Sequence, residues 1–183
     1  MSMTVFVDLI KPKVWEGEVL AVVSGSLFLA IMSQLSIYLG FTPVPLSLQT
    51  LAVFLVGAYL GSNKGAAAVF FYLVQGACGL PVFTKMSGGL TALLGPTGGY
   101  LVGFVFAAYI VGYLVEQRHI LLGLFVGNSI ILFFGCLWLS FYVGVSRACD
   151  LGLYPFLIGD LLKIGIAALM IHSGKKIGSH LLR

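Results

Sequence analysis

The sequence predicts an all-α integral membrane protein with six transmembrane helices. Three observations lead to this fold class: hydrophobic residues make up 60% of the 183-residue chain, charged residues make up 9%, and short polar or Pro- and Gly-rich breaks separate the apolar stretches. A soluble domain ordinarily carries about 25% charged residues, so the composition excludes that class. The lysines and arginines lie near the ends of the apolar stretches, which indicates a role in topology rather than binding of nucleic acid.

The chain divides into a lead, one helical domain and a tail. Residues 1–18 carry both acids and lysines, and Pro12 and Trp15 suggest that this polar segment lies at the membrane interface. Residues 19–174 contain the apolar stretches and form the transmembrane domain, whereas residues 175–183 form a basic tail. The first apolar stretch continues as a full span, so we expect no cleavable signal peptide.

The first span, about residues 19–38, carries small residues four positions apart, and such spacing lets another helix approach closely. These are Ala21 with Gly25 and Ser26 with Ala30. The pattern fits internal packing and a partner surface equally well. A break at 39–46 follows, in which Pro43 and Pro45 interrupt the helix.

The remaining spans follow in order, with one long interruption. Residues 81–99 form a glycine-rich stretch that contains Lys85, and a loop of this length between spans is usually functional. A tight turn at 61–65 joins the second and third spans. The spans after the first are predicted at about 47–60, 63–80, 97–115, 120–144 and 154–173.

The positive residues predict that both termini are cytoplasmic, because six spans place them on one side and cytoplasmic segments carry an excess of Lys and Arg. The proline break, the glycine-rich loop and the start of the last span then face the outside. Seven positive residues fall inside and two outside: Lys11, Lys13, Lys64, Arg118, Lys175, Lys176 and Arg183 inside, and Lys85 and Arg147 outside.

Asp160 and Lys163 place opposite charges within the last span. They are three residues apart, so they share one face of a helix. Each charge costs about 2.5 to 3.5 kcal/mol near the centre of a bilayer, and such residues usually mark a functional site. The alternative is an ion pair that only fixes helix packing. Asp160 is about 9 Å from the outer end of its helix, at 1.5 Å per residue, so a solute from outside can reach it.

Other polar groups are predicted to meet the pair at the outer side. Gln49 and Thr50 begin the second span and offer amide and hydroxyl groups. The segment Gly95–Tyr100 resembles a helix start, whose free N–H groups around Thr97, Gly98 and Gly99 can receive an anion. Tyr100, Phe83 and Trp138 are candidates for apolar walls, although single aromatic residues on membrane helices more often serve packing.

The sequence gives little support for catalysis. No histidine or cysteine has metal-ligand spacing, and no phosphate-binding glycine loop or Gly-x-Ser-x-Gly motif occurs. We therefore expect no metal, no cofactor and no ATP hydrolysis by this chain. An integral membrane enzyme that uses Asp160 as a general base is the alternative from another functional class.

Several motifs, in order, resemble the BioY family, the biotin-specific substrate-binding (S) components of energy-coupling factor (ECF) transporters. The resemblance covers roughly residues 20–173. The motifs are Phe41-Thr42-Pro43-Val44-Pro45, Leu48-Gln49-Thr50-Leu51-Ala52-Val53, Gly79-Leu80-Pro81-Val82-Phe83, Gly88-Gly89-Leu90, Gly95-Pro96-Thr97-Gly98-Gly99-Tyr100-Leu101, and Gly159-Asp160 with Lys163.

The resemblance implies a six-helix S-component-like bundle that binds biotin in a pocket open to the outside and contacts membrane lipid. It also implies a transmembrane coupling protein and two ATPase subunits as partners, or self-association where the protein acts alone. In that family a small-xxx-small motif of the first helix contacts the coupling protein, which assigns this role to Ser26 and Ala30. Asp160 can accept hydrogen bonds from the two ureido N–H groups, and Lys163 can donate to the ureido carbonyl.

Three departures from the family pattern concern the ligand. Ser47 replaces a usual threonine, Ile158 stands where proline often precedes Gly-Asp, and Thr84–Ser87 replaces a stretch richer in glycine. The last departure introduces Lys85, which joins the Thr97–Gly99 turn as a candidate partner for the ligand carboxylate. It also leaves open an S component for another carboxylate-bearing vitamin.

Overall fold

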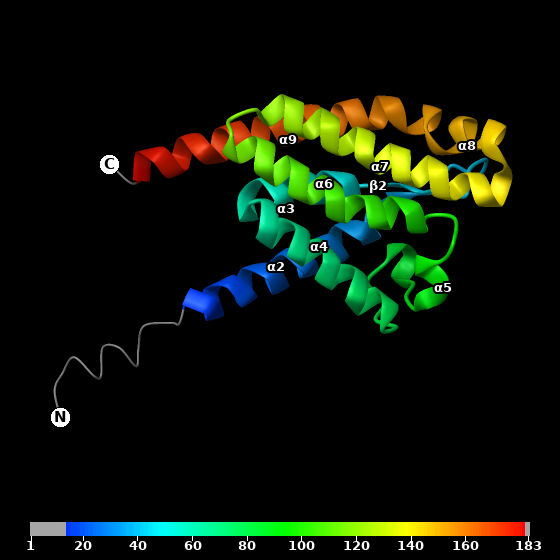
Figure 1. The fold of residues 1–183 in the computed structure, drawn as a ribbon, viewed down its shortest axis with the longest axis horizontal. Helices are drawn as coiled ribbons and strands as arrows, with labels where there is room; N and C mark the ends of the chain where they lie inside the picture. The colour runs from blue at the N-terminus through cyan, green and yellow to red at the C-terminus, as the bar shows by residue number, and fades with distance from the viewer. Residues whose placement is uncertain (1–13, 182–183) are drawn as a thin grey trace.

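The computed structural model describes the backbone of residues 14–181 and the side chains of residues 16–174. The predicted lead and tail therefore lie partly outside the described residues. Helices occupy the predicted spans (Figure 1): α2 (Val14–Gln34), α3 (Gln49–Leu60), α4 (Ser62–Ala77), α6 (Gly98–Glu116), α7 (Ile120–Val143) and α9 (Tyr154–Leu181).

The membrane class is confirmed, while the count of six crossings stays a prediction. Four described segments are long and apolar enough to cross a membrane: Glu16–Gln34, Gly98–Glu116, Ile120–Val143 and Val145–Gly174. The α3 helix has 12 residues, which span about 18 Å at 1.5 Å per residue, less than the roughly 30 Å of a bilayer core. Because residues 49–57 are all buried, α3 is the central helix of the bundle rather than a lipid-facing one.

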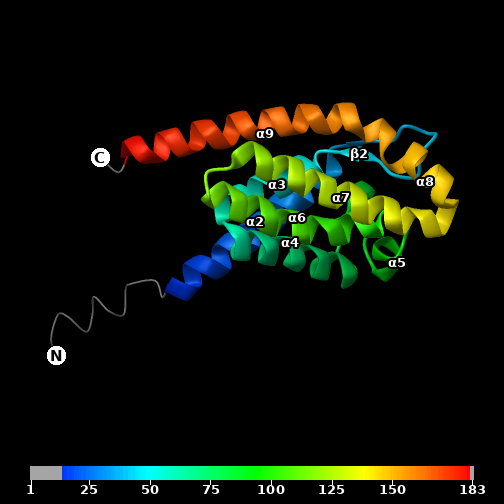
Figure 2. The same cartoon turned by 45° about the horizontal axis from the view of Figure 1, so that its top comes forward.

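Small residues allow the central helices to approach closely. Gly57 of α3 lies against the backbone of Ala108 on α6, and Gly103 of α6 lies against Ile131 on α7. A side chain on either glycine would enter the neighbouring helix. This packing produces a tight α3–α6–α7 layer, seen from a second direction in Figure 2. Such close contacts replace the hydrophobic driving force that lipid does not supply.

The connections at one end of the bundle contain more secondary structure than the sequence predicts. We call this the loop end, formed by residues 35–48, 78–97 and α8 (Val145–Gly152). The predicted first span ends early, at Gln34, because β1 (Ser36–Ile37) pairs antiparallel with β2 (Leu46–Ser47). The glycine-rich loop contains η1 (Thr84–Met86) and α5 (Leu90–Leu93).

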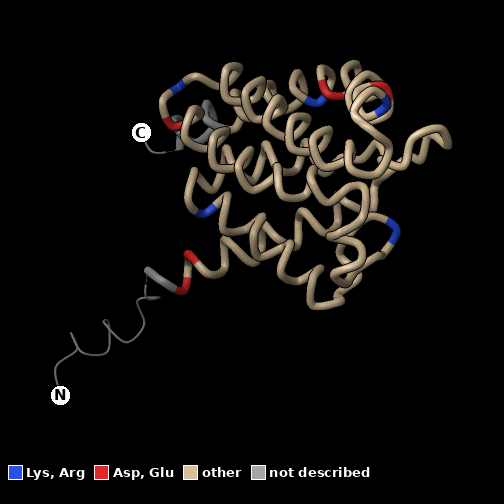
Figure 3. The backbone as a smooth tube through the Cα atoms, turned by 45° about the vertical axis from the view of Figure 1, so that its right-hand side comes forward, with Lys and Arg blue, Asp and Glu red and all other residues tan. Residues whose placement is uncertain are grey.

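Charged residues lie toward the two ends of the described bundle, and the middle of the helices carries few (Figure 3). The first described residue of α2 and the last of α9 lie at the end opposite the loop end. This arrangement agrees with both termini on one side. Which side of the membrane they face stays a prediction.

Candidate binding site

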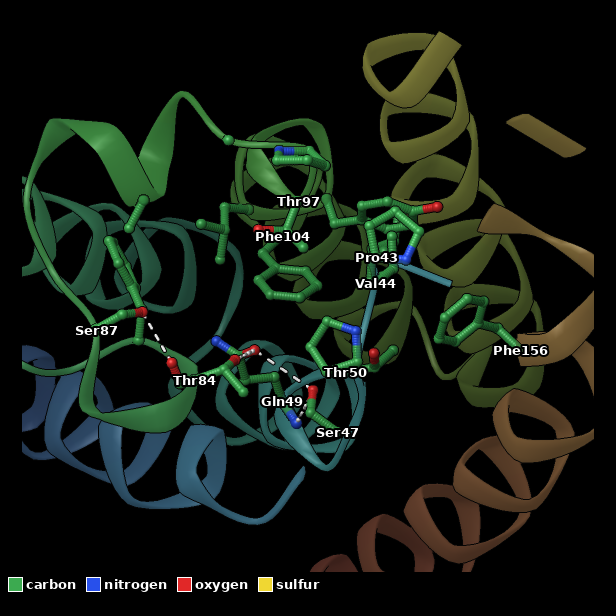
Figure 4. Close-up of a pocket in the computed structure, with 18 of the residues that line it drawn as sticks. Pro43, Val44, Ser47, Gln49, Thr50, Thr84, Ser87, Thr97, Phe104 and Phe156 are labelled. Atoms are coloured by element: carbon green, nitrogen blue, oxygen red, sulfur yellow. Dashed lines mark hydrogen bonds between the residues drawn. The ribbon is translucent and has the colours of Figure 1, made fainter. Parts of the chain in front are cut away.

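A cavity of about 450 Å³ opens among the connections of the loop end (Figure 4). Residues from both long connections and from α3, α6, α7 and α9 line it. Most of its wall is apolar, and its polar groups come from a few positions. The apolar side chains include Pro43, Val44, Phe83, Leu101, Phe104, Ile131, Leu132 and Phe156.

Asp160 and Lys163 line this cavity from one face of α9. Lys163 Nζ donates to Asp160 Oδ1 over 3.1 Å, and the two residues are only 6% and 4% exposed. Pairing offsets part of the cost of burying each charge. The ammonium group carries three N–H donors, and the bond to Asp160 occupies one of them. The pair can therefore present both a carboxylate and N–H donors to a ligand. The helix continues unbroken through Ile158, where proline is common in the family.

Gln49 and Thr50 line the cavity from the first turn of α3, as the sequence predicts for their position. The Gln49 amide is already engaged within the protein. Its Nε2 donates to the Tyr72 hydroxyl over 2.6 Å, and its Oε1 accepts from the Thr84 hydroxyl at 3.5 Å. Tyr72 in turn donates to the carbonyl of Val82 over 3.1 Å. Gln49 therefore ties the glycine-rich loop to α3 and α4.

Tyr100 and Thr97 also line the cavity, from the start of α6. The Tyr100 hydroxyl donates to the Gly152 carbonyl over 2.7 Å, which anchors α6 to the end of α8. The Tyr100 ring lies beside Phe156, with 6.4 Å between the ring centroids. These two rings from α6 and α9 form an apolar wall near the charged pair.

Gly98 and Gly99 lie in the same turn but are not among the lining residues. The Gly98 N–H donates to the Gly95 carbonyl over 2.9 Å, so it is not free in the way a helix start predicts. Both glycines pack against Trp138 of α7, and neither leaves room for a Cβ atom. Trp138 donates from Nε1 to the Gly95 carbonyl at 3.0 Å, and this bond holds the turn against α7.

Lys85 is exposed at the rim and is likewise absent from the lining. Its Nζ lies 3.5 Å from the centroid of the Tyr38 ring, and Tyr38 does line the cavity. Burial raises the pKa of the Tyr38 phenol above its ordinary value, so the phenol is neutral beside the lysine. The structure thus brings together Asp160, Lys163, Gln49, Thr50, Thr97 and Tyr100, and places Lys85 beside them.

The small residues of α2 face the interior of the chain more than the sequence alone indicates. A Cβ on Gly25 would meet Leu60 and Ala68 at 2.9 and 3.0 Å, and Ser26 is fully buried. Ala21 and Ala30 are half-buried. Internal packing therefore accounts for Gly25 and Ser26, and a partner contact at these positions stays a prediction.

Sequence reasoning missed the residues that hold the cavity wall in place. Tyr72, Thr42 and Gln34 all bond to distant backbone carbonyls; Thr42, for example, donates to Leu151 over 2.7 Å. A polar residue inside an apolar stretch is the signal that could have identified Gln34 and Tyr72. Within the described residues, no group of three His, Cys, Asp or Glu side chains could hold a metal.

Comparison with known proteins places the chain among transporters. A protein named probable biotin transporter BioY from Pyrococcus horikoshii is 38% identical over 148 residues, 79% of this chain and 90% of that protein. The biotin transporter BioY of Thermotoga maritima is 40% identical over 154 residues, 81% of this chain and 90% of its own.

A solved structure supports the same assignment. The crystal structure of the S-component for biotin from an ECF-type ABC transporter superposes with a TM-score of 0.78 at 26% identity. The match covers 96% of this chain and 95% of that one. Residues 9–180 match the model of the BioY family. The chain therefore belongs to the BioY family.

Proposed function

We propose that this chain binds biotin with high affinity for uptake across the cytoplasmic membrane. The buried Asp160–Lys163 pair in the wall of the cavity is the observation that carries the proposal. An ion pair buried at this depth is costly unless it faces a ligand or solvent-filled space. Relatives and the similar solved structure are named for biotin, which supports the choice of ligand.

The chemistry of the cavity matches the two ends of biotin. The ureido ring offers two N–H donors and one carbonyl, which suit a carboxylate acceptor and an ammonium donor. The fused rings and aliphatic chain fit the wall formed by residues such as Phe104, Ile131 and Phe156. The carboxylate then lies toward the mouth of the cavity, near Thr97 and Lys85. The Asp160–Lys163 pair thus selects the ureido ring of the ligand.

Orientation follows from the charge distribution. The chain is a multi-pass integral membrane protein of the cell membrane. The excess of Lys and Arg in the segments that the sequence predicts to be cytoplasmic supports a loop end that faces outward, with both termini in the cytoplasm. In this orientation the cavity receives biotin from outside.

Uphill transport needs an energy source from another subunit. The sequence contains no phosphate-binding glycine loop, and the similar solved structure is described as a component of an ECF-type ABC transporter. We infer a transmembrane coupling protein and two ATPase subunits as partners. In their absence, self-association and slow facilitated uptake are the alternative.

Two other functions are the alternatives to biotin binding. An S component for a different carboxylate-bearing vitamin would keep the fold and change the cavity, and the departure at Thr84–Ser87 is the observation that favours it. The enzyme alternative is set aside because the BioY family is a family of transporter components rather than enzymes.

Ligand recovery separates the two vitamin hypotheses. The chain is purified in detergent from cells grown with biotin, and the bound molecule is released by denaturation and identified by mass spectrometry. We expect intact biotin in near-stoichiometric amount. A different vitamin in its place would overturn the proposed ligand while leaving the transport role in place.

A further inference from the structure

The tip of the glycine-rich loop is a strained turn. Lys85 and Met86 have φ angles of 60° and 55°, in the left-handed region that residues with a Cβ seldom adopt. The turn is closed by a hydrogen bond of 3.0 Å from the Phe83 N–H to the Ser87 carbonyl. Two consecutive residues in this conformation persist only when surrounding contacts hold them.

Gln34, the last residue of α2, supplies those contacts. Its Nε2 donates to the Phe83 carbonyl over 3.0 Å, and its Oε1 accepts from the Met86 N–H over 3.0 Å. One side chain thus forms hydrogen bonds to the backbone on both sides of the turn. The Ser33 hydroxyl adds a bond of 2.7 Å to the carbonyl of Val82, just before the turn. The end of α2 therefore fixes the conformation of the tip.

The strained turn sets Lys85 at the mouth of the cavity. Its ammonium lies 3.5 Å from the centroid of the Tyr38 ring, while Thr84 and Ser87, on either side of the tip, line the cavity (Figure 4). A cation over an aromatic ring that solvent can reach is held only weakly. An anion at the mouth would compete successfully for this cation.

The cavity lining does not balance an anionic ligand group by itself. Among the described lining residues the ionised groups are Asp160 and Lys163, and they pair with each other. A carboxylate brought to the mouth therefore adds one uncompensated negative charge. Lys85 carries the opposite charge at the rim.

We propose that Lys85 selects ligands with an anionic tail, and that Gln34 is the positioning residue that makes this selection possible. The ammonium moves from the Tyr38 ring to the ligand carboxylate, and the rigid turn keeps the lysine within reach of the mouth. This inference rests on the proposed function for the identity of the ligand. It adds a specificity device that acts at the end of the ligand opposite to the Asp160–Lys163 pair.

The test compares biotin with its neutral methyl ester, because the two ligands differ only at the tail. Binding of each to the full-length, detergent-purified chain is measured by isothermal titration calorimetry. We expect Lys85→Gln to weaken biotin binding about fivefold, the upper range for an exposed ion pair, and to leave ester binding unchanged. Lys85→Arg keeps the charge and retains the preference for biotin over the ester.

Gln34→Leu tests the positioning role. It removes both bonds to the turn, and we expect the same loss of preference for biotin over the ester as in Lys85→Gln. If Gln34 had a purely structural role, Gln34→Leu would weaken the binding of both ligands equally, and that result would overturn this part of the proposal. Lys64→Gln, an exposed lysine near the opposite end that pairs with Glu18, is the matched control and leaves both affinities unchanged.

The possible results separate this inference from the proposed function. The first possible result is that the wild type binds biotin and Lys85→Gln leaves both affinities unchanged or lowers both equally. In that case Lys85 does not recognise the ligand carboxylate. If the wild type binds neither ligand, the proposed function itself fails and the inference fails with it.

Discussion

The side-chain amide of Gln49 donates to the hydroxyl of Tyr72 over 2.6 Å, and this bond joins the first turn of α3 to the middle of α4. The Tyr72 hydroxyl donates in turn to the carbonyl of Val82, next to the buried ring of Phe83. The Phe83 ring meets the Tyr72 ring edge-on, with 5.4 Å between centroids. The cavity wall at Phe83 therefore depends on a residue that does not itself line the cavity.

Tyr72→Phe is expected to loosen this wall. The change removes the acceptor for the Gln49 Nε2 group, whereas the Val82 carbonyl keeps its bond from the Ser33 hydroxyl. An unsatisfied buried polar group costs about 1 to 3 kcal/mol. We expect a lower unfolding temperature in detergent and weaker biotin binding. Tyr113→Phe, at an exposed position on α6, is the control and should match the wild type in both measurements. A Tyr72→Phe chain that equals the wild type would show that the hydrogen bonds are dispensable.

Replacing the charged pair by neutral residues is expected to separate folding from binding. Lys163→Met alone leaves the Asp160 carboxylate buried without its partner, which typically costs about 3 to 5 kcal/mol. The double variant Asp160→Leu with Lys163→Met removes both charges, and such replacements are often neutral or stabilising. We therefore expect thermal stability to fall in the single variant and to recover in the double variant.

Biotin binding should be absent from both of these chains. Thermal unfolding followed by tryptophan fluorescence gives the stability, and equilibrium dialysis with labelled biotin gives the binding. Retained biotin affinity in a stable double variant would assign the pair to packing alone.

Gly57→Ala is expected to disrupt the central layer of helices. The new Cβ would lie 2.5 Å from the Ala108 carbonyl oxygen and 3.1 Å from its Cα, so one helix must move. Overpacking of this kind costs about 1 to 3 kcal/mol. Gly165→Ala on α9 is the matched control, because no heavy atom lies within 4 Å of its new Cβ. The control should be as stable as the wild type or more so, since alanine favours a helix over glycine.

The unfolding temperatures of these two glycine variants in one detergent supply the comparison. Equal temperatures would mean that α3 and α6 can separate without loss, contrary to the packing described above.

Transport by the chain alone is expected to equilibrate biotin without concentrating it. We expect no ATP hydrolysis by this chain, and without an energy source a membrane protein can lower the barrier to passage but cannot drive accumulation. Proteoliposomes with labelled biotin outside provide the measurement, with and without the ATPases and coupling protein of a cognate transporter. Accumulation above the external concentration by the chain alone, without an ion gradient, would contradict the need for a partner.

The sequence predicts the charged pair and the polar start of α3 because their positions follow from local rules. Asp160 and Lys163 are one helical turn apart, and Gln49 and Thr50 directly follow a proline break. These relationships require no knowledge of distant contacts. The same reasoning placed Thr97 and Tyr100 at a helix start, where the structure has them.

The supporting residues could not be predicted because they depend on how the connections fold back on the bundle. Gln34 bonds to a carbonyl 49 residues away, and Thr42 to one 109 residues away. The N–H group of Gly98, which the sequence predicts to be free, instead donates to the Gly95 carbonyl. Gly98 and Gly99 both lie against Trp138, a contact that a glycine-rich turn alone does not predict.

Equilibrium binding of labelled biotin to the purified wild type and to Asp160→Asn is the decisive test of whether Asp160 binds the ligand. Asp150→Asn, an exposed acid on α8, serves as the control for the loss of one negative charge. We expect tight, competable binding by the wild type and the control. We expect affinity at least about tenfold lower for Asp160→Asn, because a hydrogen bond to a charged group contributes about 1.5 to 3 kcal/mol. Equal affinities for all three chains would contradict the assignment of Asp160 to the ligand site.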